Sequence, residues 1–190
     1  MPRGVVIPQV RQQLFAALER LIATEGLSGL TGRAVTRAAG VATGLLYTHF
    51  RSWEGFLAQY ATDRSFQLAS GVADLAGRAG TATVAANLDD AVNATPFDVV
   101  VPLTRLLASR ADLAAEVERV LGPGTAGLAA VEQAVARYLA AEQDRGRLPA
   151  ATDPGAAALA LVGVLHYRVL TGADRSEVDS SIRLLTTAFI

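Results

Sequence analysis

The chain has 190 residues, of which 51% are hydrophobic and only 6% aromatic, and its formal net charge is −1. It contains no cysteine, which excludes disulfides, cysteine nucleophiles and cysteine-ligated zinc or iron–sulfur sites. All 17 basic residues are arginines, so a Walker A lysine and a Schiff-base lysine are excluded too. Alanine and leucine dominate the hydrophobic residues, and both favour helices, so the composition predicts an all-α fold.

The first predicted helix begins near Pro8 and ends at Gly26, and its apolar residues recur at helical spacing. Thr31 is placed to cap a second, short helix that runs to about residue 39. Gly40 then provides a tight turn before a third short helix at about 43–49. Ser52 caps a longer fourth helix, which we expect to end at Gly77 and Gly80.

Six further helices are predicted, and no segment shows convincing strand alternation. The last is expected to begin at a Ser176 cap, and Val178, Ile182, Leu185 and Phe189 form its apolar stripe. The six are expected at about 82–94, 96–109, 112–121, between Gly124 and Gly146, and at about 154–170 and 176–189.

Charge is unevenly distributed along the chain. Residues 1–65 carry seven arginines and four acidic residues, a net charge of +3. Residues 66–190 carry ten arginines and fourteen acidic residues, a net charge of −4. A basic N-terminal part on an acidic remainder fits a DNA-reading head on a body that does not touch DNA.

A cytoplasmic protein without a membrane span is expected. Residues 1–8 are too short an apolar stretch for a secretory signal. The longest apolar run, Gly155–Leu165, has 11 residues, whereas a transmembrane helix needs about 20.

The two short helices and the glycine between them predict a helix-turn-helix. Ala38 and Ala39 are small enough to allow a close approach of the helices, and Val41 fills the space beneath the turn. The following helix presents small and polar residues, which can enter the major groove.

The residues that carry this pattern resemble the TetR family of bacterial transcriptional regulators, over about residues 8–60. The resemblance implies an all-α protein of about nine helices. Residues 1–52 would be a three-helix DNA-binding domain and residues 53–190 a larger ligand-binding and dimerisation domain. The matching positions are Leu30–Thr31, Ala39–Gly40–Val41, Gly44, Leu46–Tyr47, His49–Phe50, Ser52, Glu54 and Leu57.

The resemblance also implies contacts with a palindromic operator through the major groove. Thr31, Arg33, Tyr47 and His49 would contact phosphates. Position 53, which is Trp53 in this chain, is a further phosphate-contact position of the family. Base edges or backbone would be approached by Thr43, Gly44, Leu45 and Thr48. Tyr47 also fits plain packing, and Arg37 and Arg51 fit either DNA contacts or solvated charges.

Three positions depart from the family pattern. Ala42 replaces the serine that usually caps the recognition helix, so Thr43 is the remaining cap candidate. Val35–Thr36 replaces an Ile–Ala pair and places a hydroxyl at a tight contact. Trp53 replaces a phosphate-binding lysine, and its indole N–H would donate one hydrogen bond to a phosphate, or its ring would be buried against the head. Either role predicts a shallow salt dependence of DNA binding.

The resemblance implies a homodimer through about 153–171 and 175–189, and Gly155, Ala156 and Gly163 would permit close helix packing. It also implies a small-molecule inducer, which the sparse charges over 82–110 predict to be largely apolar. Each candidate ligand contact also fits an ordinary core or surface residue. The candidates are Asn87, Asn93, Thr104, Arg105, Tyr138, His166 and Tyr167.

The sequence is compatible with two classes of function and disfavours a third. The first is a repressor that an inducer releases from its operator. The second is a TetR-like protein that has lost specific DNA binding and acts as a ligand- or protein-binding module, which Ala42 and Trp53 support. An enzyme is disfavoured because no paired catalytic motif is present, and neither a cofactor nor a metal is expected.

Overall fold

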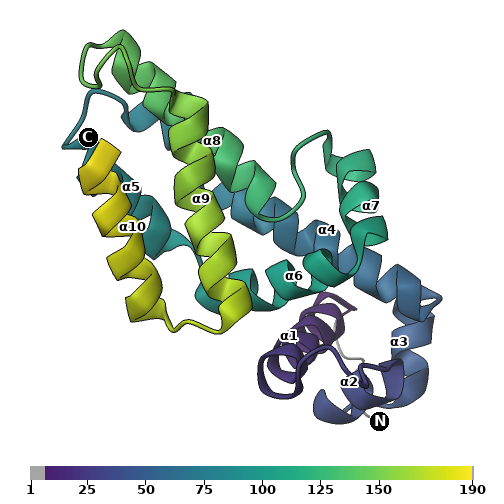
Figure 1. The fold of residues 1–190 in the computed structure, drawn as a ribbon. Helices are drawn as coiled ribbons and strands as arrows, with labels where there is room; N and C mark the ends of the chain where they lie inside the picture. Colours follow the sequence, from purple (N-terminus) through teal and green to yellow (C-terminus); the bar gives the residue numbers. More distant parts are fainter. Residues whose placement is uncertain (1–6, 190) are drawn as a thin grey trace.

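The computed structural model describes residues 7–189, and within that range it contains helices and no strand (Figure 1). This all-helical architecture confirms the predicted fold class. The described residues form ten α-helices, the number predicted along the chain and one more than the nine or so that the resemblance implies. They are α1 (Ile7–Glu25), α2 (Gly32–Ala38), α3 (Thr43–Phe50), α4 (Trp53–Gly71), α5 (Val84–Ala94), α6 (Phe97–Ser109), α7 (Ala111–Leu121), α8 (Leu128–Asp144), α9 (Pro154–Thr171) and α10 (Arg175–Phe189), and the short 3-10 helix η1 (Ala76–Arg78) lies between α4 and α5.

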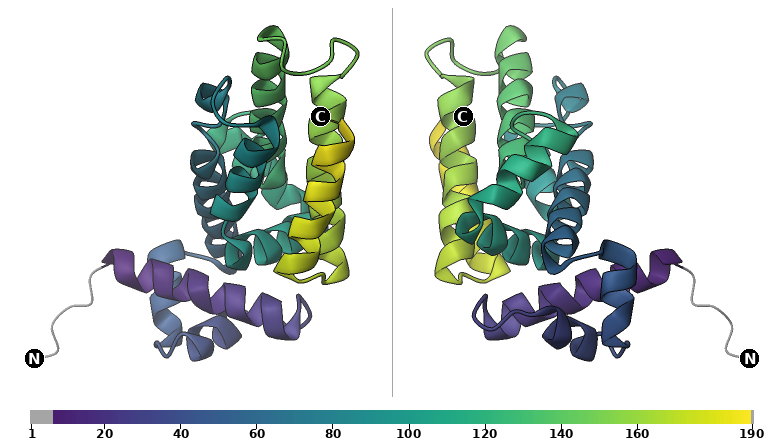
Figure 2. Two further views of the ribbon diagram at one scale, coloured as in Figure 1. Left: turned by 90° about the vertical axis from the view of Figure 1, so that its left-hand side faces the viewer. Right: turned by 90° about the vertical axis from the view of Figure 1, so that its right-hand side faces the viewer.

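The helices form a small head and a larger body. Figure 2 shows α1, α2 and α3 gathered at one end of the molecule, beneath the longer upright helices. Helix α4 leads from the head into the body, where it packs against α6, α7 and α8. Helices α9 and α10 lie side by side at one side of the body.

The predicted caps and end points of the head helices are confirmed. The Thr31 hydroxyl accepts a hydrogen bond from the Ala34 N–H at 3.2 Å, and the Ser52 hydroxyl accepts one from the Gly55 N–H at 2.9 Å. Gly26 ends α1 with φ +74°, a backbone conformation that side chains with a Cβ rarely adopt. These local signals set where three helices begin or end.

The predicted end of α4 was wrong, because the helix stops at Gly71. Gly77 lies in η1 and Gly80 in the loop that follows. The Gly80 N–H donates to Glu142 on α8 at 3.1 Å, so a distant helix holds this segment out of α4.

The predicted cap of the last helix was also wrong. The helix begins at Arg175, and the Asp174 carboxylate accepts a hydrogen bond from the Glu177 N–H at 3.0 Å. The Ser176 hydroxyl donates to that same carboxylate at 2.8 Å. Ser176 therefore supports the cap and does not supply it.

The apolar stripe of α10 points into its own body. Val178 is 1% exposed and Ile182 is 3% exposed, while Leu185 is half-buried. The side chain of Phe189 lies outside the described residues. The outward face of α10 instead carries Leu184, which is 75% exposed, so the stripe explains the folding of one chain and not contact between chains.

Helix α9 is long and apolar enough to cross a membrane by length and composition alone, with a mean hydropathy of 1.3 over 18 residues. The expectation based on the longest apolar run did not anticipate this. A helix of a folded core meets the same criterion, and α9 packs against α6, α8 and α10.

Candidate nucleic-acid interface and body cavity

The turn between α2 and α3 has the geometry that a helix-turn-helix needs. Gly40 adopts φ +68°, its N–H donates to the Arg37 carbonyl at 3.1 Å, and the Val41 N–H reaches back to the Thr36 carbonyl at 3.0 Å. These bonds close α2 and redirect the chain at once. Because Gly40 can adopt this positive φ, the chain turns tightly enough for α3 to lie across α2.

Thr36 and Thr43 join the two helices through their side chains. The Thr36 hydroxyl is buried and lies 3.3 Å from the Thr43 hydroxyl, and it also donates toward the Gly32 carbonyl at 2.9 Å. The departure from the family pattern at position 36 therefore places a satisfied hydroxyl at the contact. Thr43 is engaged with α2, and α3 has no side-chain cap at Ala42.

The start of α2 lies directly beside α3 and α4. A Cβ added to Gly32 would lie 3.2 Å from the Tyr47 Oη and 3.7 Å from the Trp53 ring. Only a glycine leaves this space open without displacing the tyrosine. Sequence reasoning missed Gly32, because nothing local to it signals a close approach.

Most of the predicted DNA contacts are accessible at the surface of the head. Thr31, Arg33, Thr43, Gly44, Tyr47 and Thr48 are exposed, while Leu45 and His49 are half-buried. Helix α3 presents Gly44 and Thr48 one turn apart, and the Thr48 hydroxyl donates to the Gly44 carbonyl at 3.0 Å.

Trp53 packs against the head. Its ring stacks on Phe56 with centroids 5.4 Å apart and an interplanar angle of 27°, and the residue is half-buried. A neutral ring packed in this way supplies no positive charge for a phosphate. This geometry matches one of the two roles considered for Trp53.

Two side chains of α1, which sequence reasoning did not single out, fix α2 from behind. The Gln13 amide donates to the Ala39 carbonyl at 2.7 Å, and the Arg20 guanidinium donates to the Ala38 carbonyl at 3.1 Å. These carbonyls belong to the end of α2, where helical partners run out. Helix α1 thereby sets the position of the helix-turn-helix.

A buried arginine links the head to the body. Arg64 on α4 donates to Glu19 at 2.6 Å and to Gln12 at 2.9 Å, both on α1, and it lies over the Phe15 ring at 5.3 Å. Burial raises the pKa of Glu19, and its bond to Arg64 opposes that rise. Asp98 on α6 adds a further negative charge near Glu19. Arg64 thus attaches α1 of the head to α4, and α1 also packs against α6.

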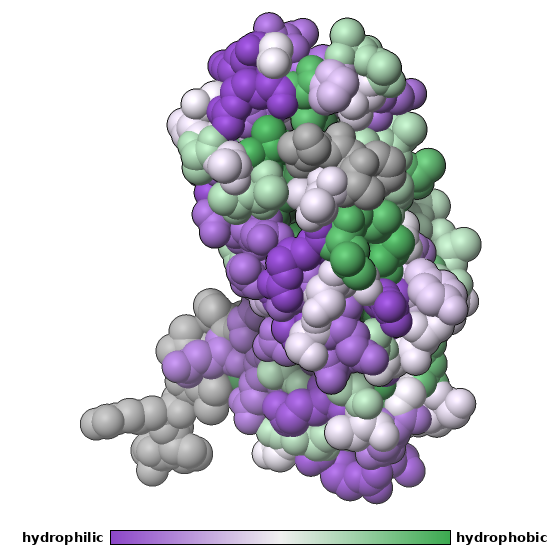
Figure 3. Space-filling model, turned by 60° about the vertical axis from the view of Figure 1, so that its left-hand side comes forward, coloured by the Kyte–Doolittle hydropathy of each residue, from purple (hydrophilic) through white to green (hydrophobic). Residues whose placement is uncertain are grey.

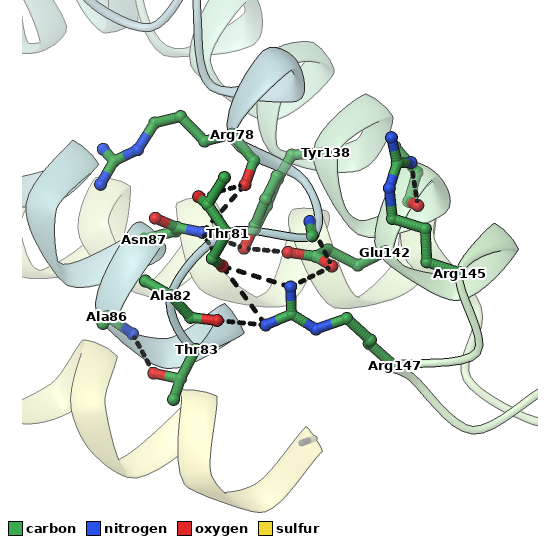
Figure 4. Close-up of polar contacts among 12 residues, drawn as sticks. Arg78, Thr81, Ala82, Thr83, Ala86, Asn87, Tyr138, Glu142, Arg145 and Arg147 are labelled. Atoms are coloured by element: carbon green, nitrogen blue, oxygen red, sulfur yellow. Dashed lines mark hydrogen bonds and ion pairs between the residues drawn. The ribbon is translucent and has the colours of Figure 1, made fainter.

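Two predicted ligand contacts belong to a polar network (Figure 4). The Tyr138 hydroxyl donates to Glu142 at 2.7 Å and accepts a hydrogen bond from the Asn87 amide at 3.1 Å. Arg147 pairs with Glu142 at 3.3 Å and donates to the carbonyls of Thr81 and Ala82. Burial and the Glu142 bond raise the pKa of Tyr138 to about 12. The network fastens the loop before α5 to α8.

The other predicted ligand contacts are dispersed. Thr104 and His166 border an open hollow between α6, α8 and α9. Asn93 accepts a hydrogen bond from Arg175 at 3.4 Å, Arg105 is half-buried, and Tyr167 is 63% exposed. The structure therefore does not bring the predicted ligand residues together in one pocket.

A different set of residues encloses an apolar cavity in the body. It lies among α5, α6, α8, α9 and α10, and its volume is about 40 Å³. Its walls are aliphatic and aromatic apart from Thr95 and Arg175, and they include Leu88, Phe97, Val135, Leu165 and Ile182. Sequence reasoning missed these residues, because each one resembles ordinary helix core.

Residues 14–60 match the family model described as bacterial regulatory proteins of the tetR family. The match spans the second half of α1, the helix-turn-helix and the first half of α4. Over the described residues the chain is all-helical, and residues 14–60 are similar to the N-terminal domain of TetR-family regulators, which confirms the predicted resemblance.

Several solved structures share the fold over nearly the whole chain. A TetR-like transcriptional regulator from Rhodococcus sp. RHA1 is 19% identical with a TM-score of 0.62, over 97% of this chain and 95% of that one. FadR, the fatty acid degradation regulator from Bacillus halodurans, is 18% identical with a TM-score of 0.67, over 97% and 96%. FadR from Bacillus subtilis, solved in complex with stearoyl-CoA, is 17% identical with a TM-score of 0.66, over 94% and 98%.

Among curated protein sequences, no match to this chain was found.

Proposed function

We propose that the protein is a cytoplasmic, sequence-specific DNA-binding transcriptional regulator, a repressor that a small, largely apolar ligand releases from its operator. The observation that carries this proposal is the helix-turn-helix at the end of the molecule, in which α3 exposes Gly44 and Thr48. A helix presented in this way fits the major groove. The proposal is that of a binding protein and not of an enzyme.

Phosphate contacts are assigned to the start of α2 and to Tyr47 of α3, which lies beside it. Thr31, Arg33 and Tyr47 are exposed near the start of α2, where unpaired backbone N–H groups favour a negative charge. Thr43, Gly44, Leu45 and Thr48 would meet the groove, with His49 and Trp53 at its border. Phosphate contacts position the protein, and the α3 contacts supply the specificity.

A homodimer is proposed through the outer faces of α9 and α10. Leu159, Gly163, Tyr167 and Leu170 recur along one exposed side of α9, and Leu184 is exposed on α10. Figure 3 shows hydrophobic side chains exposed on the side of the molecule that carries α10. Exposed apolar stripes of this kind mark association sites, and two heads would read the two halves of a palindrome.

The ligand would occupy the apolar cavity of the body. Stearoyl-CoA, the molecule in the complex of the Bacillus subtilis FadR, carries a long apolar chain, which suits walls of this composition. Phe97 and Val100 line the cavity from α6, and α6 packs against α1 of the head. A ligand that moves α6 would therefore change the position of the heads.

The proposal is tested by selecting bound sequences from random duplex DNA with the purified protein. Enrichment of a palindrome with fixed half-site spacing is expected, and Arg33→Ala should weaken binding to it while an exposed body control, Arg137→Ala, leaves binding unchanged. A folded, dimeric sample that enriches no sequence at low salt would overturn the regulator. It would favour instead a ligand- or protein-binding module that has lost specific DNA binding, as Ala42 and Trp53 suggest.

The salt dependence of operator binding gives a sharper test. Because Trp53 is neutral and packed on Phe56, the logarithmic slope of affinity against salt should stay well below the value of about ten found when many phosphates are contacted. Trp53→Lys should steepen the slope by about two in a dimer, one charge for each head. A wild-type slope as steep as ten would refute the assignment of few charged contacts.

A further inference from the structure

One charged side chain lines the apolar cavity of the body. Arg175, the first residue of α10, is the only charged residue among the described residues that border it. The other wall residues are aliphatic or aromatic apart from Thr95, whose hydroxyl already donates to the Ala91 carbonyl at 2.8 Å. The cavity is therefore apolar over most of its surface and positive at one place.

The guanidinium of Arg175 closes this side of the cavity. It donates to the Val92 carbonyl at 2.7 Å and to the Thr95 carbonyl at 2.9 Å, which are the last acceptors of α5. It also pairs with Asp179 on α10 at 3.0 Å and lies over the Phe97 ring at 5.7 Å. A single side chain thus holds the start of α10 against the end of α5 and the start of α6.

The cavity is too small for a ligand unless the wall that Arg175 holds in place moves. A volume of about 40 Å³ holds a few water molecules, whereas small-molecule sites measure about 300 Å³ or more. A ligand must therefore displace part of the wall. Moving α10 away from α5 would remove the carbonyl acceptors of Arg175 while its ion pair with Asp179, on the same helix, moves with it. The N–H groups that lose the carbonyls would then need another acceptor, because an unmade hydrogen bond is costly.

We propose that the cavity binds a small amphiphile with an apolar body and one carboxylate, and that Arg175 pairs with that carboxylate. The ligand then fills the apolar space with its chain and replaces the carbonyl acceptors with its anionic group, through a two-point hydrogen bond that a guanidinium suits. This inference rests on the proposed function and names the ligand class of its body site.

The test compares octanoate with 1-octanol, which shares its chain length and lacks the charge. Binding is measured on the full chain without DNA, by calorimetry and by the shift of the melting temperature. We expect octanoate to bind at least tenfold more tightly than 1-octanol to the wild type. Arg175→Gln should remove that preference, whereas Arg137→Gln, at an exposed position of α8, should keep it.

Arg175→Lys provides a second variant, because it retains the charge if Arg175→Gln fails to fold. It should bind octanoate with intermediate affinity, since a lysine cannot form the two-point contact. Equal binding of octanoate and 1-octanol to the wild type, or an octanoate preference that survives Arg175→Gln, would overturn the inference and leave Arg175 as a strap between helices. Because no DNA is present, that failure is separate from a failure to select an operator.

Discussion

The head and the body differ in what fills their cores. Around the head, Phe15, Phe50, Phe56 and Tyr60 form a compact aromatic cluster, with ring centroids 5.0 to 5.7 Å apart. The walls of the body cavity are mostly valines and leucines, and there a space of about 40 Å³ remains.

The difference teaches how one chain can combine a fixed reading surface with an adaptable site. Large planar rings interlock in few arrangements, so the aromatic cluster holds α1, α3 and α4 in one geometry. Small aliphatic side chains around an existing void can repack at lower cost, because fewer contacts are lost when they move. A repressor of the proposed kind needs both properties.

The largest expected effect comes from removing a ring of the head. Phe50→Ala should lower the free energy of unfolding by about 3–5 kcal/mol, because the side chain is 2% exposed and contacts two other rings. Leu165→Ala, at the cavity, should cost about 2 kcal/mol, at the low end for such a truncation. Urea unfolding measures both, and equal losses would contradict the contrast between the two cores.

Adding one methylene to each core sharpens the comparison. Val35→Ile, at a fully buried position of the head, should destabilise the protein by about 1–3 kcal/mol through overpacking. Val135→Ile, beside the cavity, should be neutral or stabilise by up to about 0.8 kcal/mol, the value of one buried methylene. Thermal unfolding of the pair is the measurement. If Val135→Ile lowered the stability as much as Val35→Ile, the cavity could not accommodate an added methylene.

The hydroxyl contact between α2 and α3 should have a smaller effect on stability. Thr36→Val should cost about 1 kcal/mol and should also weaken operator binding, because Thr43 loses its partner across the helix-turn-helix. Thr62→Val is the matched control, since the Thr62 hydroxyl only donates to the Ala58 carbonyl of its own helix. If both variants bound operator equally well, the Thr36 contact would have no role in positioning α3.

The smallest effect concerns pH at the link between head and body. Burial raises the pKa of Glu19 in the folded protein, so its contribution to stability is fully present below the pKa of the unfolded chain and is lost as pH rises through the folded pKa. Between pH 7 and pH 4, the wild type should therefore gain stability relative to Glu19→Gln as pH falls. Urea unfolding across that range tests this, and a difference that is constant or of opposite sign would refute it.

The sequence alone determined the helix starts and ends that depend on neighbouring residues. Thr31 and Ser52 cap their helices, and Gly26 and Gly40 adopt the positive φ that their positions require. Each of these depends on backbone within a few residues, so a pattern read along the chain contains the necessary information. The same holds for most of the exposed head residues that we propose as DNA contacts.

Tertiary structure decided which distant residues meet. It placed Asn87 and Tyr138 in a network with Glu142, and not in the cavity. It also brought Arg175 to the end of α5, about eighty positions earlier in the chain. Helical periodicity states that a residue faces inward but not which helix lies opposite, so the buried polar contacts and the cavity of this protein follow only from the packing of all its helices.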